Sequence, residues 1–289
     1  MTATATAIIT EPGVYDIPEA VYHADPVPEG SLSASGAKKI LQCPARFDYD
    51  RKQPPQPTTA MELGTAVHKL VLGVGADIVV VDADNYRTKD AQGQAASARA
   101  AGKIPLLPKE HAEAQAIASA VRRHPLAGAL FSNGTPEQSL FWQDAEFGIW
   151  CRARLDWLPE PGPWGHRMVI PDLKTTSSAD PQGLGRTAGN FGYHIQHAQY
   201  LDGVRALGLD AAPAFLFVFV ETEPPYLVTV AELDGESAEA GRTACRAARE
   251  KFRDCTESGI WPGYSAGDEI RLISMPPWIR GRTYEGLMS

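Results

Sequence analysis

The sequence predicts an α/β fold in which a mixed central sheet is flanked by helices. Short runs of β-forming, apolar residues, above all 168–174 and 214–221, are typical of strands. Longer stretches of helical composition, such as 109–123 and 235–258, separate or follow these runs. Of the 289 residues, 44% are hydrophobic, which is enough to form a substantial core.

The N-terminal half is expected to contain helices and loops. Ser33 or Ser35 can cap a helix over Gly36–Leu41, whose apolar side chains form one stripe. A second helix is expected to start at the small residues before Val67 and to run over 67–72. Three further segments are predicted here: a loop at 53–58, a mobile helix or loop at 91–103, and a helix at 109–123 that ends at His124-Pro125.

The next elements are two strands, Gly148–Leu158 and Met168–Lys174. The Pro-Gly-rich segment 159–163 between them suits an antiparallel pair. Such a pair can bring Asp156 beside Asp172. Four elements and a tail are predicted after these strands: a helix at 190–207, a central buried strand at 214–221, a strand at 226–233, a helix at 235–258, and an irregular tail from Trp261.

The segment Asp172-Leu173-Lys174, with Asp156 upstream, is the most informative feature for function. Side chains alternate along a strand, so Asp172 and Lys174 share one face. Carboxylates can hold Mg²⁺ or Mn²⁺, and a lysine can orient or deprotonate a water or stabilise developing charge. This combination suits a metal-dependent phosphodiester hydrolase, although Asp-x-Lys alone is a short pattern that also occurs as a surface pair.

Five motifs in a fixed order carry a resemblance to a known family. They are Gly64-Thr65-Ala66-Val67-His68, Glu137 to Trp142, Arg152 to Asp156, Asp172 to Thr176, and Gln196 to Tyr200. The set resembles the RecB-like branch of the PD-(D/E)xK nuclease superfamily. Within that branch it is most similar to the RecE (exonuclease VIII) type of phage and prophage recombination exonucleases. The motifs span residues 31–200.

The resemblance implies a metal site and a catalytic lysine. His68 matches the family's motif histidine, a metal ligand, and Asp156 matches the first strand carboxylate, although Leu155 replaces the proline of the superfamily name. Asp172 and Lys174 match the acid and lysine of the second strand. The carbonyl of Leu173 completes the metal shell in such enzymes. Mg²⁺ is therefore the expected cofactor, with Mn²⁺ as a possible substitute.

The same resemblance implies residues on the DNA side of the site. Gln196 and Tyr200 match a Q-x-x-x-Y helix that lines this side, and Glu137 stands where related enzymes carry an auxiliary catalytic acid. Arg152 and Arg154 share the strand face of Asp156, so their guanidinium groups can contact phosphate. Outside the motifs each has a simpler interpretation: Gln196 and Tyr200 as surface positions, Glu137 as a solvated residue, and the arginines as stems that cover the sheet.

The implied activity is degradation of the 5′-ended strand of linear duplex DNA, which leaves a 3′ single strand for a RecT-like annealing protein. Double-stranded DNA ends are the implied substrate, and a closed homo-oligomer, a trimer or tetramer ring, is the implied assembly. Two alternatives stay open. One is another RecB-like nuclease, acting on single strands or in CRISPR adaptation. The other is a DNA-end-binding module without catalysis.

Domain organisation and location follow from what the chain contains. Residues 1–30 are interpreted as a partly disordered N-terminal lead-in and 31–289 as a single nuclease domain. No run approaches the roughly 20 apolar residues of a membrane helix. Residues 1–10 lack the features of a signal peptide, so we expect a cytoplasmic protein in a bacterial host cell with no membrane contact.

Cysteine placement and net charge complete the expectations. Some RecB-like nucleases bind an iron–sulfur cluster, and Cys43 resembles its first ligand. Cys151 lies inside a strand and only Cys245 and Cys255 lie late, so we expect no iron–sulfur cluster. The net charge of −8 calls for a local basic path to DNA. Its candidate residues, besides the two arginines above, are Lys38, Lys39, Arg46, Arg51, Lys52 and Arg186.

Overall fold

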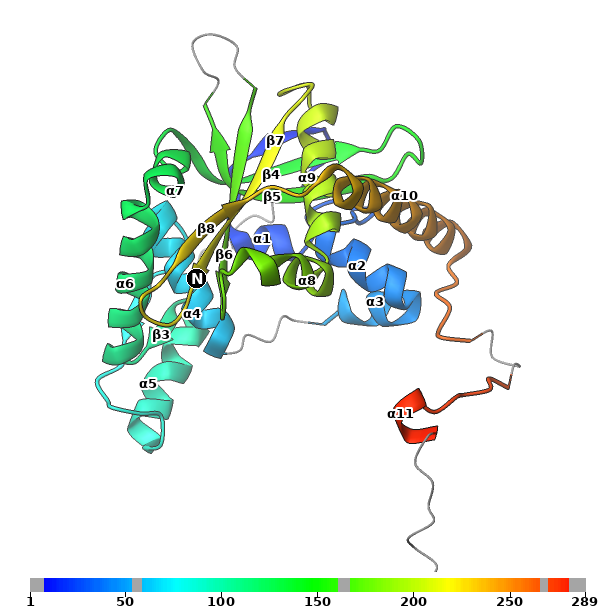
Figure 1. The fold of residues 1–289 in the computed structure, drawn as a ribbon. Coiled ribbons are helices and arrows are strands. Elements are labelled where there is room, and N and C mark those ends of the chain that lie inside the picture. The colour runs from blue at the N-terminus through cyan, green and yellow to red at the C-terminus, as the bar shows by residue number, and fades with distance from the viewer. Residues whose placement is uncertain (1–7, 54–58, 161–166, 266–269, 281–289) are drawn as a thin grey trace, which may run out of the picture.

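Two adjacent three-stranded sheets form the centre of the molecule (Figure 1). The structure is a computed structural model and describes residues 8–53, 59–160, 167–265 and 270–280. The first sheet has the order β1 (Gly13–Tyr15), β4 (Gly134–Gln143), β5 (Trp150–Pro159), with antiparallel neighbours. In the second, β6 (Val169–Thr176) pairs in parallel with β7 (Ala214–Glu221), and β7 pairs antiparallel with β8 (Val228–Ala231). The predicted mixed α/β architecture is confirmed.

The predicted antiparallel ladder between the two site strands is wrong. β5 pairs with β4, and β6 pairs with β7 in the parallel direction. β5 and β6 nevertheless lie side by side, because the carboxylate of Asp156 accepts a hydrogen bond from the backbone N–H of Leu173 at 2.7 Å. A side chain thus takes the place that a backbone carbonyl would have in a ladder. Part of the connecting segment, 161–166, lies outside the described residues.

Helices cover both faces of β6 and β7. One apolar cluster joins Ile170 and three phenylalanines of β7 to helices α2, α9 and α10; a second joins Leu173, Val218 and Val220 to α4, α6 and α7. This alternation follows from the period of two along a strand that is buried on both faces. The helices are α1 (Glu19–His23), α2 (Ala34–Gln42), α3 (Pro44–Asp50), α4 (Thr59–Leu72), α5 (Lys89–Ala100), α6 (Pro108–Arg123), α7 (Pro125–Leu130), α8 (Pro181–Phe191), α9 (Tyr193–Ala206), α10 (Gly235–Ser258) and α11 (Pro277–Arg280). A small parallel pair, β2 (Ile78–Val80) and β3 (Ile104–Leu106), lies beside α5 and α6.

Several predicted elements are confirmed closely. β7 and α10 have the predicted bounds, and α6 differs by one residue. Ser33 is the cap of α2, since its hydroxyl accepts a hydrogen bond from the N–H of Gly36 at 3.1 Å. Residues 89–100 form a helix, and the strand predicted at 226–233 is shortened to β8. Of the predicted loop at 53–58, residues 54–58 lie outside the described part of the chain.

Two predicted helix boundaries are wrong, and a glycine explains the second. α4 begins at Thr59, so Gly64 lies inside it rather than at its start. A Cβ at Gly64 would make an ordinary van der Waals contact with Thr175 Oγ1 at 3.4 Å, so Gly64 lies on the side of α4 that faces β6. The helix predicted at 190–207 is divided into α8 and α9 by Gly192, whose φ of 65° lies in the left-handed region. Glycine adopts this conformation without steric cost and ends α8 there.

The segment predicted as a lead-in contributes to the fold. Ile9, Ile17, Tyr22 and Val27 are buried in a cluster with Phe141 and Trp150, and β1 pairs with β4. Residues 1–7 lie outside the described part. No helix in the described ranges combines the length and the hydropathy that a membrane crossing requires. The cysteines Cys43, Cys151, Cys245 and Cys255 are all buried free thiols.

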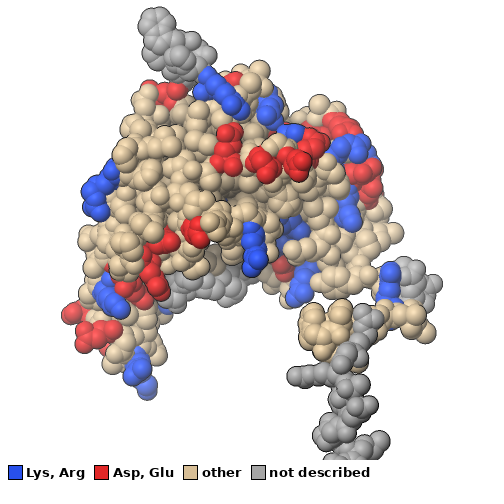
Figure 2. Space-filling view, viewed as in Figure 1, with Lys and Arg blue, Asp and Glu red and all other residues tan. Residues whose placement is uncertain are grey.

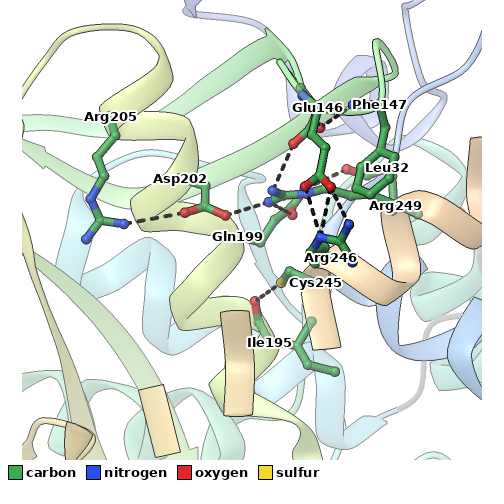
Figure 3. Close-up of polar contacts among 11 residues, drawn as sticks. Leu32, Glu146, Phe147, Ile195, Gln199, Asp202, Arg205, Cys245, Arg246 and Arg249 are labelled. Carbon is green, nitrogen blue, oxygen red and sulfur yellow. Dashed lines mark hydrogen bonds and ion pairs between the residues drawn. The ribbon is translucent and has the colours of Figure 1, made fainter. Parts of the chain in front are cut away.

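A buried arginine joins α9 and α10 to the turn between β4 and β5 (Figure 3). Arg249 donates to Asp144 Oδ2 at 3.0 Å, to Gln199 Oε1 at 2.7 Å and to Asp202 Oδ2 at 2.8 Å. The amide of Gln199 in turn donates to the carbonyl of Leu32 at 2.9 Å, directly before the cap of α2. We call these four side chains, Arg249, Asp144, Gln199 and Asp202, the Arg249 network. It fixes the position of α2 relative to α9.

Candidate active site

A cavity of about 570 Å³ opens where β5 and β6 meet helices α2, α4 and α9. Its lining includes His68 from α4, Asp156 from β5, and Gln196 and Tyr200 from α9. These residues come from three separate parts of the sequence. The cavity is therefore assembled by the packing of the two helix layers around the edge between the sheets.

His68 and Asp156 form the first contact of the site. His68 Nε2 lies 3.3 Å from Asp156 Oδ2, and its Nδ1 lies 2.9 Å from the carbonyl of Gly64. Because a carbonyl can only accept, Nδ1 carries the proton in this contact and Nε2 faces the carboxylate. Burial alone would lower the pKa of His68, but the attraction of Asp156 outweighs it and raises the pKa to about 9. Burial opposes ionisation of Asp156, yet His68 and Lys174 hold its pKa below the usual range.

Asp172 and Lys174 form the second contact, one strand further in. Asp172 is 1% exposed; its Oδ1 accepts a hydrogen bond from Gln196 Nε2 at 2.6 Å, and its Oδ2 forms an ion pair with Lys174. Burial raises the pKa of Asp172 to about 6, against the attraction of Lys174. Burial would lower the pKa of Lys174, but Asp172 and Asp156 together raise it. Among the described residues, Oδ2 has no hydrogen bond of normal geometry, so Lys174 is its main partner.

The structure therefore connects most of the predicted site residues. His68, Asp156, the backbone of Leu173, Asp172, Lys174 and Gln196 form one continuous set of contacts. The N–H and C=O of one strand residue point to the same side, so the carbonyl of Leu173 faces the gap between β5 and β6 as its N–H does. Tyr200 lines the cavity and packs edge-on against Phe215, 5.6 Å between ring centroids.

Glu137 and Arg154 lie at the rim of the same cavity. The pairs on either side, Pro136 with Trp157 and Gln138 with Leu155, place Glu137 opposite Asp156. Arg154 forms an ion pair with Glu137 Oε2 at 2.7 Å. The backbone φ of Glu137 is 55°, which is uncommon for a residue with a Cβ. Glu137 is thus held by an ion pair, not free in solvent.

Arg152 lies apart from these residues. Its Nη1 contacts Asp25 Oδ2 at 2.5 Å and both the carbonyl and the hydroxyl of Ser31 at 2.6 and 2.7 Å. It lines a second cavity of about 440 Å³ that meets the first at Tyr22, His23, Ser33 and Ser35. The charge of Arg152 is balanced by Asp25, and the contacts of its guanidinium group fix the loop before α2.

Cations and anions are interspersed over the face of the molecule that Figure 2 shows. Of the residues predicted as a basic path, Lys39 pairs with Asp50, and Arg51 and Lys52 pair with Asp48. Lys38 instead lines the main cavity, where its Nζ donates to the carbonyl of Phe191 at 2.6 Å. Burial, followed by repulsion from Lys174, lowers the pKa of Lys38. Lys38 and Lys174 therefore lie close enough to each other to interact electrostatically.

One group near the site was missed by the sequence analysis. Tyr193 lies beside the predicted lysine, with Lys174 Nζ 5.3 Å and Lys38 Nζ 5.8 Å from its ring centroid. The signal that could have indicated it is Gly192, since a glycine inside a helical pattern indicates a break. The break places Tyr193 at the first turn of α9, next to the strand end that carries Lys174.

The donor set suits a hard divalent cation, but it is not preassembled around one position. Within the described ranges, no three side chains of His, Cys, Asp or Glu converge closely enough to hold a metal ion. His68 has the arrangement usual for a ligand, because its other ring nitrogen is bound to a carbonyl and fixes the tautomer. Asp172 would have to exchange part of its contact with Lys174 for the ion.

Comparisons with known proteins identify the family and a similar fold. The profile of the family described as "PDDEXK-like domain of unknown function (DUF3799)" matches residues 33–271. The crystal structure of a candidate exonuclease from Eubacterium rectale is similar with a TM-score of 0.60 at 14% identity, over 91% of this chain and 96% of that one. A phage-related exonuclease from Haemophilus somnus 129PT reaches a TM-score of 0.32 at 12% identity, over 80% of this chain and 96% of that one. No curated protein matches the sequence.

The first of these structural likenesses shows the fold, and the family profile covers well over half of the chain. Fold and family together support a hydrolytic nuclease. The acid–lysine pair on β6, the carboxylate on β5 and the histidine on α4 form one continuous set of contacts at the edge between the two sheets. The chain belongs to the PDDEXK-like family DUF3799, within the PD-(D/E)xK nuclease superfamily.

Proposed function

We propose that this protein is a metal-dependent exodeoxyribonuclease that degrades the 5′-ended strand of linear duplex DNA and leaves 3′ single-stranded overhangs for recombination by strand annealing. The observation that carries the proposal is the continuous set of contacts from His68 through Asp156 and Leu173 to Asp172 and Lys174, beside an open cavity. A purely structural cluster has no need of a buried lysine beside two acids at a cavity.

Mg²⁺ or Mn²⁺ would be held by His68 Nε2, the carboxylates of Asp156 and Asp172, and the carbonyl of Leu173. When bound, the ion supplies charge neutralisation for the phosphate and a more acidic water. The chain prepares this set in two ways. Gly64 holds the ring of His68 by Nδ1, and Gln196 holds Asp172 by Oδ1. The other donor atoms, His68 Nε2 and Asp172 Oδ2, are paired with Asp156 and Lys174 and would exchange part of these contacts for the ion.

Lys174 acts as a fixed cation in this proposal. Its pKa is raised by Asp172 and Asp156 despite burial, so the ammonium group stays protonated at neutral pH. A protonated lysine can stabilise negative charge on the phosphate or orient a water, but it cannot accept the proton of that water. This favours charge stabilisation over general-base catalysis for Lys174.

The DNA strand would enter along the rim residues. The cavity is lined by Tyr200, Gln196 and Arg154. Glu137 balances the positive charge of Arg154 through their ion pair. Arg152 contributes by holding the neighbouring loop, and less by contacting phosphate, because its guanidinium is engaged with Asp25 and Ser31.

The proposal is tested by incubating the protein with Mg²⁺ and duplexes labelled at either the 5′ or the 3′ end. Loss of the 5′-ended strand from linear duplex, no cleavage of circular duplex and complete inhibition by EDTA are expected. Cleavage of circular DNA, or a preference for single strands, favours another RecB-like nuclease. DNA-end binding without cleavage in either Mg²⁺ or Mn²⁺ indicates a non-catalytic module.

We also infer a closed homo-oligomer, a trimer or tetramer ring, and a RecT-like annealing protein as the partner that receives the 3′ strand. A ring can enclose a duplex, which a single domain of this size cannot, and enclosure favours repeated cleavage without dissociation. Light scattering at micromolar protein, with and without a duplex end, tests the assembly. A monomer mass in both conditions contradicts the ring and indicates distributive cleavage.

A further inference from the structure

An exposed aromatic ring, that of Phe191, contacts the tyrosine that lies beside Lys174. Phe191, the last residue of α8, is 61% exposed, and its ring stacks on Tyr193 with 5.7 Å between centroids and an angle of 17° between planes. Tyr193 is the residue whose ring lies 5.3 Å from Lys174 Nζ. Exposure of a phenylalanine so close to a charged site calls for an explanation.

The rings form a stack that begins in the core and ends at the surface. Tyr193 also stacks on Phe217 of β7, with 5.3 Å between centroids and an angle of 24° between planes. Phe217 is 1% exposed. Three nearly parallel rings, Phe217, Tyr193 and Phe191, therefore lead from the centre of the sheet outward. Phe191 is the outermost, and a further flat ring would extend the same stack.

The position of Phe191 is fixed by its neighbours. Gly192 adopts a left-handed conformation and turns the chain between α8 and α9. A Cβ at Gly192 would lie 2.9 Å from Lys38 Cδ, so the stem of Lys38 packs directly on this turn. The ammonium group of Lys38 binds the carbonyl of Phe191 at 2.6 Å. Phe191 is thus held at a defined place beside a cation that lines the cavity.

Charge and shape together indicate the ligand. The ammonium groups of Lys38 and Lys174 lie 5.8 and 5.3 Å from the centroid of Tyr193 and would attract phosphate groups, while the outer ring of Phe191 offers a flat apolar surface. A nucleotide has both parts, and every base has a face that stacks on an aromatic ring without regard to sequence. An apolar peptide would gain nothing from the lysines, and a phospholipid, which does carry phosphate, has no flat ring to stack on Phe191.

We infer that Phe191 is a stacking platform for a nucleobase of the strand that is cut, and that it positions the adjacent phosphate toward Lys174. The inference rests on the proposed function and names the state of its substrate. The terminal base of a duplex end can offer its outer face to Phe191, whereas a base further inside the duplex can stack there only after it has been unpaired.

Three substitutions in the full chain separate stacking from bulk. Phe191→Ala removes the ring, Phe191→Leu keeps much of the apolar volume without a flat face, and Phe191→Trp keeps a stacking face. Leu126→Ala on α7 is the control, since Leu126 is 51% exposed and lines neither cavity described above. Thermal unfolding of each variant confirms that the fold is retained.

The substrates are linear duplexes in which one abasic site is moved, one nucleotide at a time, along the 5′-ended strand. Wild-type protein is expected to slow roughly fivefold to a hundredfold at one register, where the missing base would stack. Phe191→Ala should be slowed by a similar factor on intact DNA and lose the extra slow step at the abasic site. Phe191→Trp should restore the wild-type pattern, and Phe191→Leu should not.

The inference is overturned if wild-type protein passes the abasic site at an unchanged rate, or if Phe191→Ala keeps the same slow step. It is also overturned if Phe191→Ala changes the mass in light scattering, because the ring would then be a contact between subunits. If the wild-type protein cleaves no DNA, the proposed function fails, but stacking remains testable. A single strand carrying 2-aminopurine should then be quenched on binding to wild-type protein and not to Phe191→Ala; equal quenching overturns the platform.

Discussion

Two clusters of charged side chains are buried in this molecule, and they differ in how their charges are balanced. In the Arg249 network one cation donates to two carboxylates and an amide at 2.7 to 3.0 Å (Figure 3). None of its four side chains lines either of the two cavities described above. In the site cluster, Asp156 and Asp172 share Lys174 and His68, and the pKa values of all four groups are shifted.

The difference concerns what each cluster can still bind. The two Nη atoms of Arg249 are fully used, and only its Nε lacks a partner among the described residues. In the site cluster, Asp172 Oδ2 is buried with a single lysine, and His68 and Asp156 border an open cavity. Titratable groups with strongly shifted pKa values beside a cavity are typical of functional sites. A paired network without a cavity is typical of structural ones.

Breaking the Arg249 network should have the largest effect, and the effect should be on stability. Arg249→Met leaves the largely buried Asp144 without its cation and Asp202 with Arg205 alone, which costs about 3–5 kcal/mol of unfolding free energy. Urea denaturation measures the loss. The cleavage rate per folded molecule should stay close to wild type, because Arg249 lines neither cavity.

The neighbouring Arg246 provides a matched control on the same helix. It pairs with Glu146 at the surface, where the two side chains are 58% and 51% exposed. Arg246→Ala should leave the unfolding free energy near the wild-type value, since exposed ion pairs contribute little. Equal losses in the two variants would contradict the distinction between a buried network and a surface pair.

Removing the lysine of the site should lower the cleavage rate, whereas breaking the Arg249 network should lower the stability. Lys174→Met keeps the length of the side chain but removes the charge, and cleavage should fall by about 10²–10³ or more, the range seen when one electrostatic group is lost. Single-turnover rates measure this, and a fluorescence binding assay should find the affinity for DNA nearly intact. Normal cleavage by this variant would remove Lys174 from catalysis.

The elements that the sequence predicts well have a strong local signal. β7 is a continuous apolar run and α10 a long helix with Asp234 as its cap, so both have the predicted bounds. Gly192 was missed as a break because the helical pattern continues on both sides of it. The pairing of β5 with β6 was missed because periodicity cannot show that the side chain of Asp156 replaces a backbone acceptor.

The site shows the same limit. The order of the motifs was sufficient to select His68, Asp156, Asp172, Lys174 and Gln196, which the structure brings into contact. Arg152 binds Asp25 and Ser31, and these two partners could not be predicted, because they lie in a loop more than a hundred positions away along the chain. Nor does any spacing rule connect Phe191 and Tyr193 to Lys174.

The third prediction concerns the metal. Asp172→Asn removes one charged donor from the proposed ligand set, and Mn²⁺ affinity should fall by about a hundredfold, the upper end of the loss seen for groups that only support a ligand. Calorimetry with Mn²⁺ measures the affinity. Asp254→Asn, at an exposed position of α10, should change nothing. An unchanged affinity in Asp172→Asn would exclude Asp172 as a ligand.

The smallest expected effect is a pH dependence of stability in the absence of metal. The pKa of His68 is about 9 in the folded protein, because Asp156 outweighs burial, and about 6.5 when unfolded. A raised folded-state pKa stabilises the fold fully below the unfolded value, and this contribution is lost as the pH rises through the folded value. In EDTA the unfolding free energy should therefore fall between pH 6.5 and 9, by at most about 1.4 kcal/mol per pH unit. His68→Gln should lack this component, while other groups that titrate in the window contribute equally to both proteins. Urea denaturation at pH 6.5, 7.5 and 9 decides the matter. Parallel curves for the two proteins would mean that His68 and Asp156 do not form an ion pair in solution, and one of the charge pairs that distinguish the site cluster from the Arg249 network would then be absent.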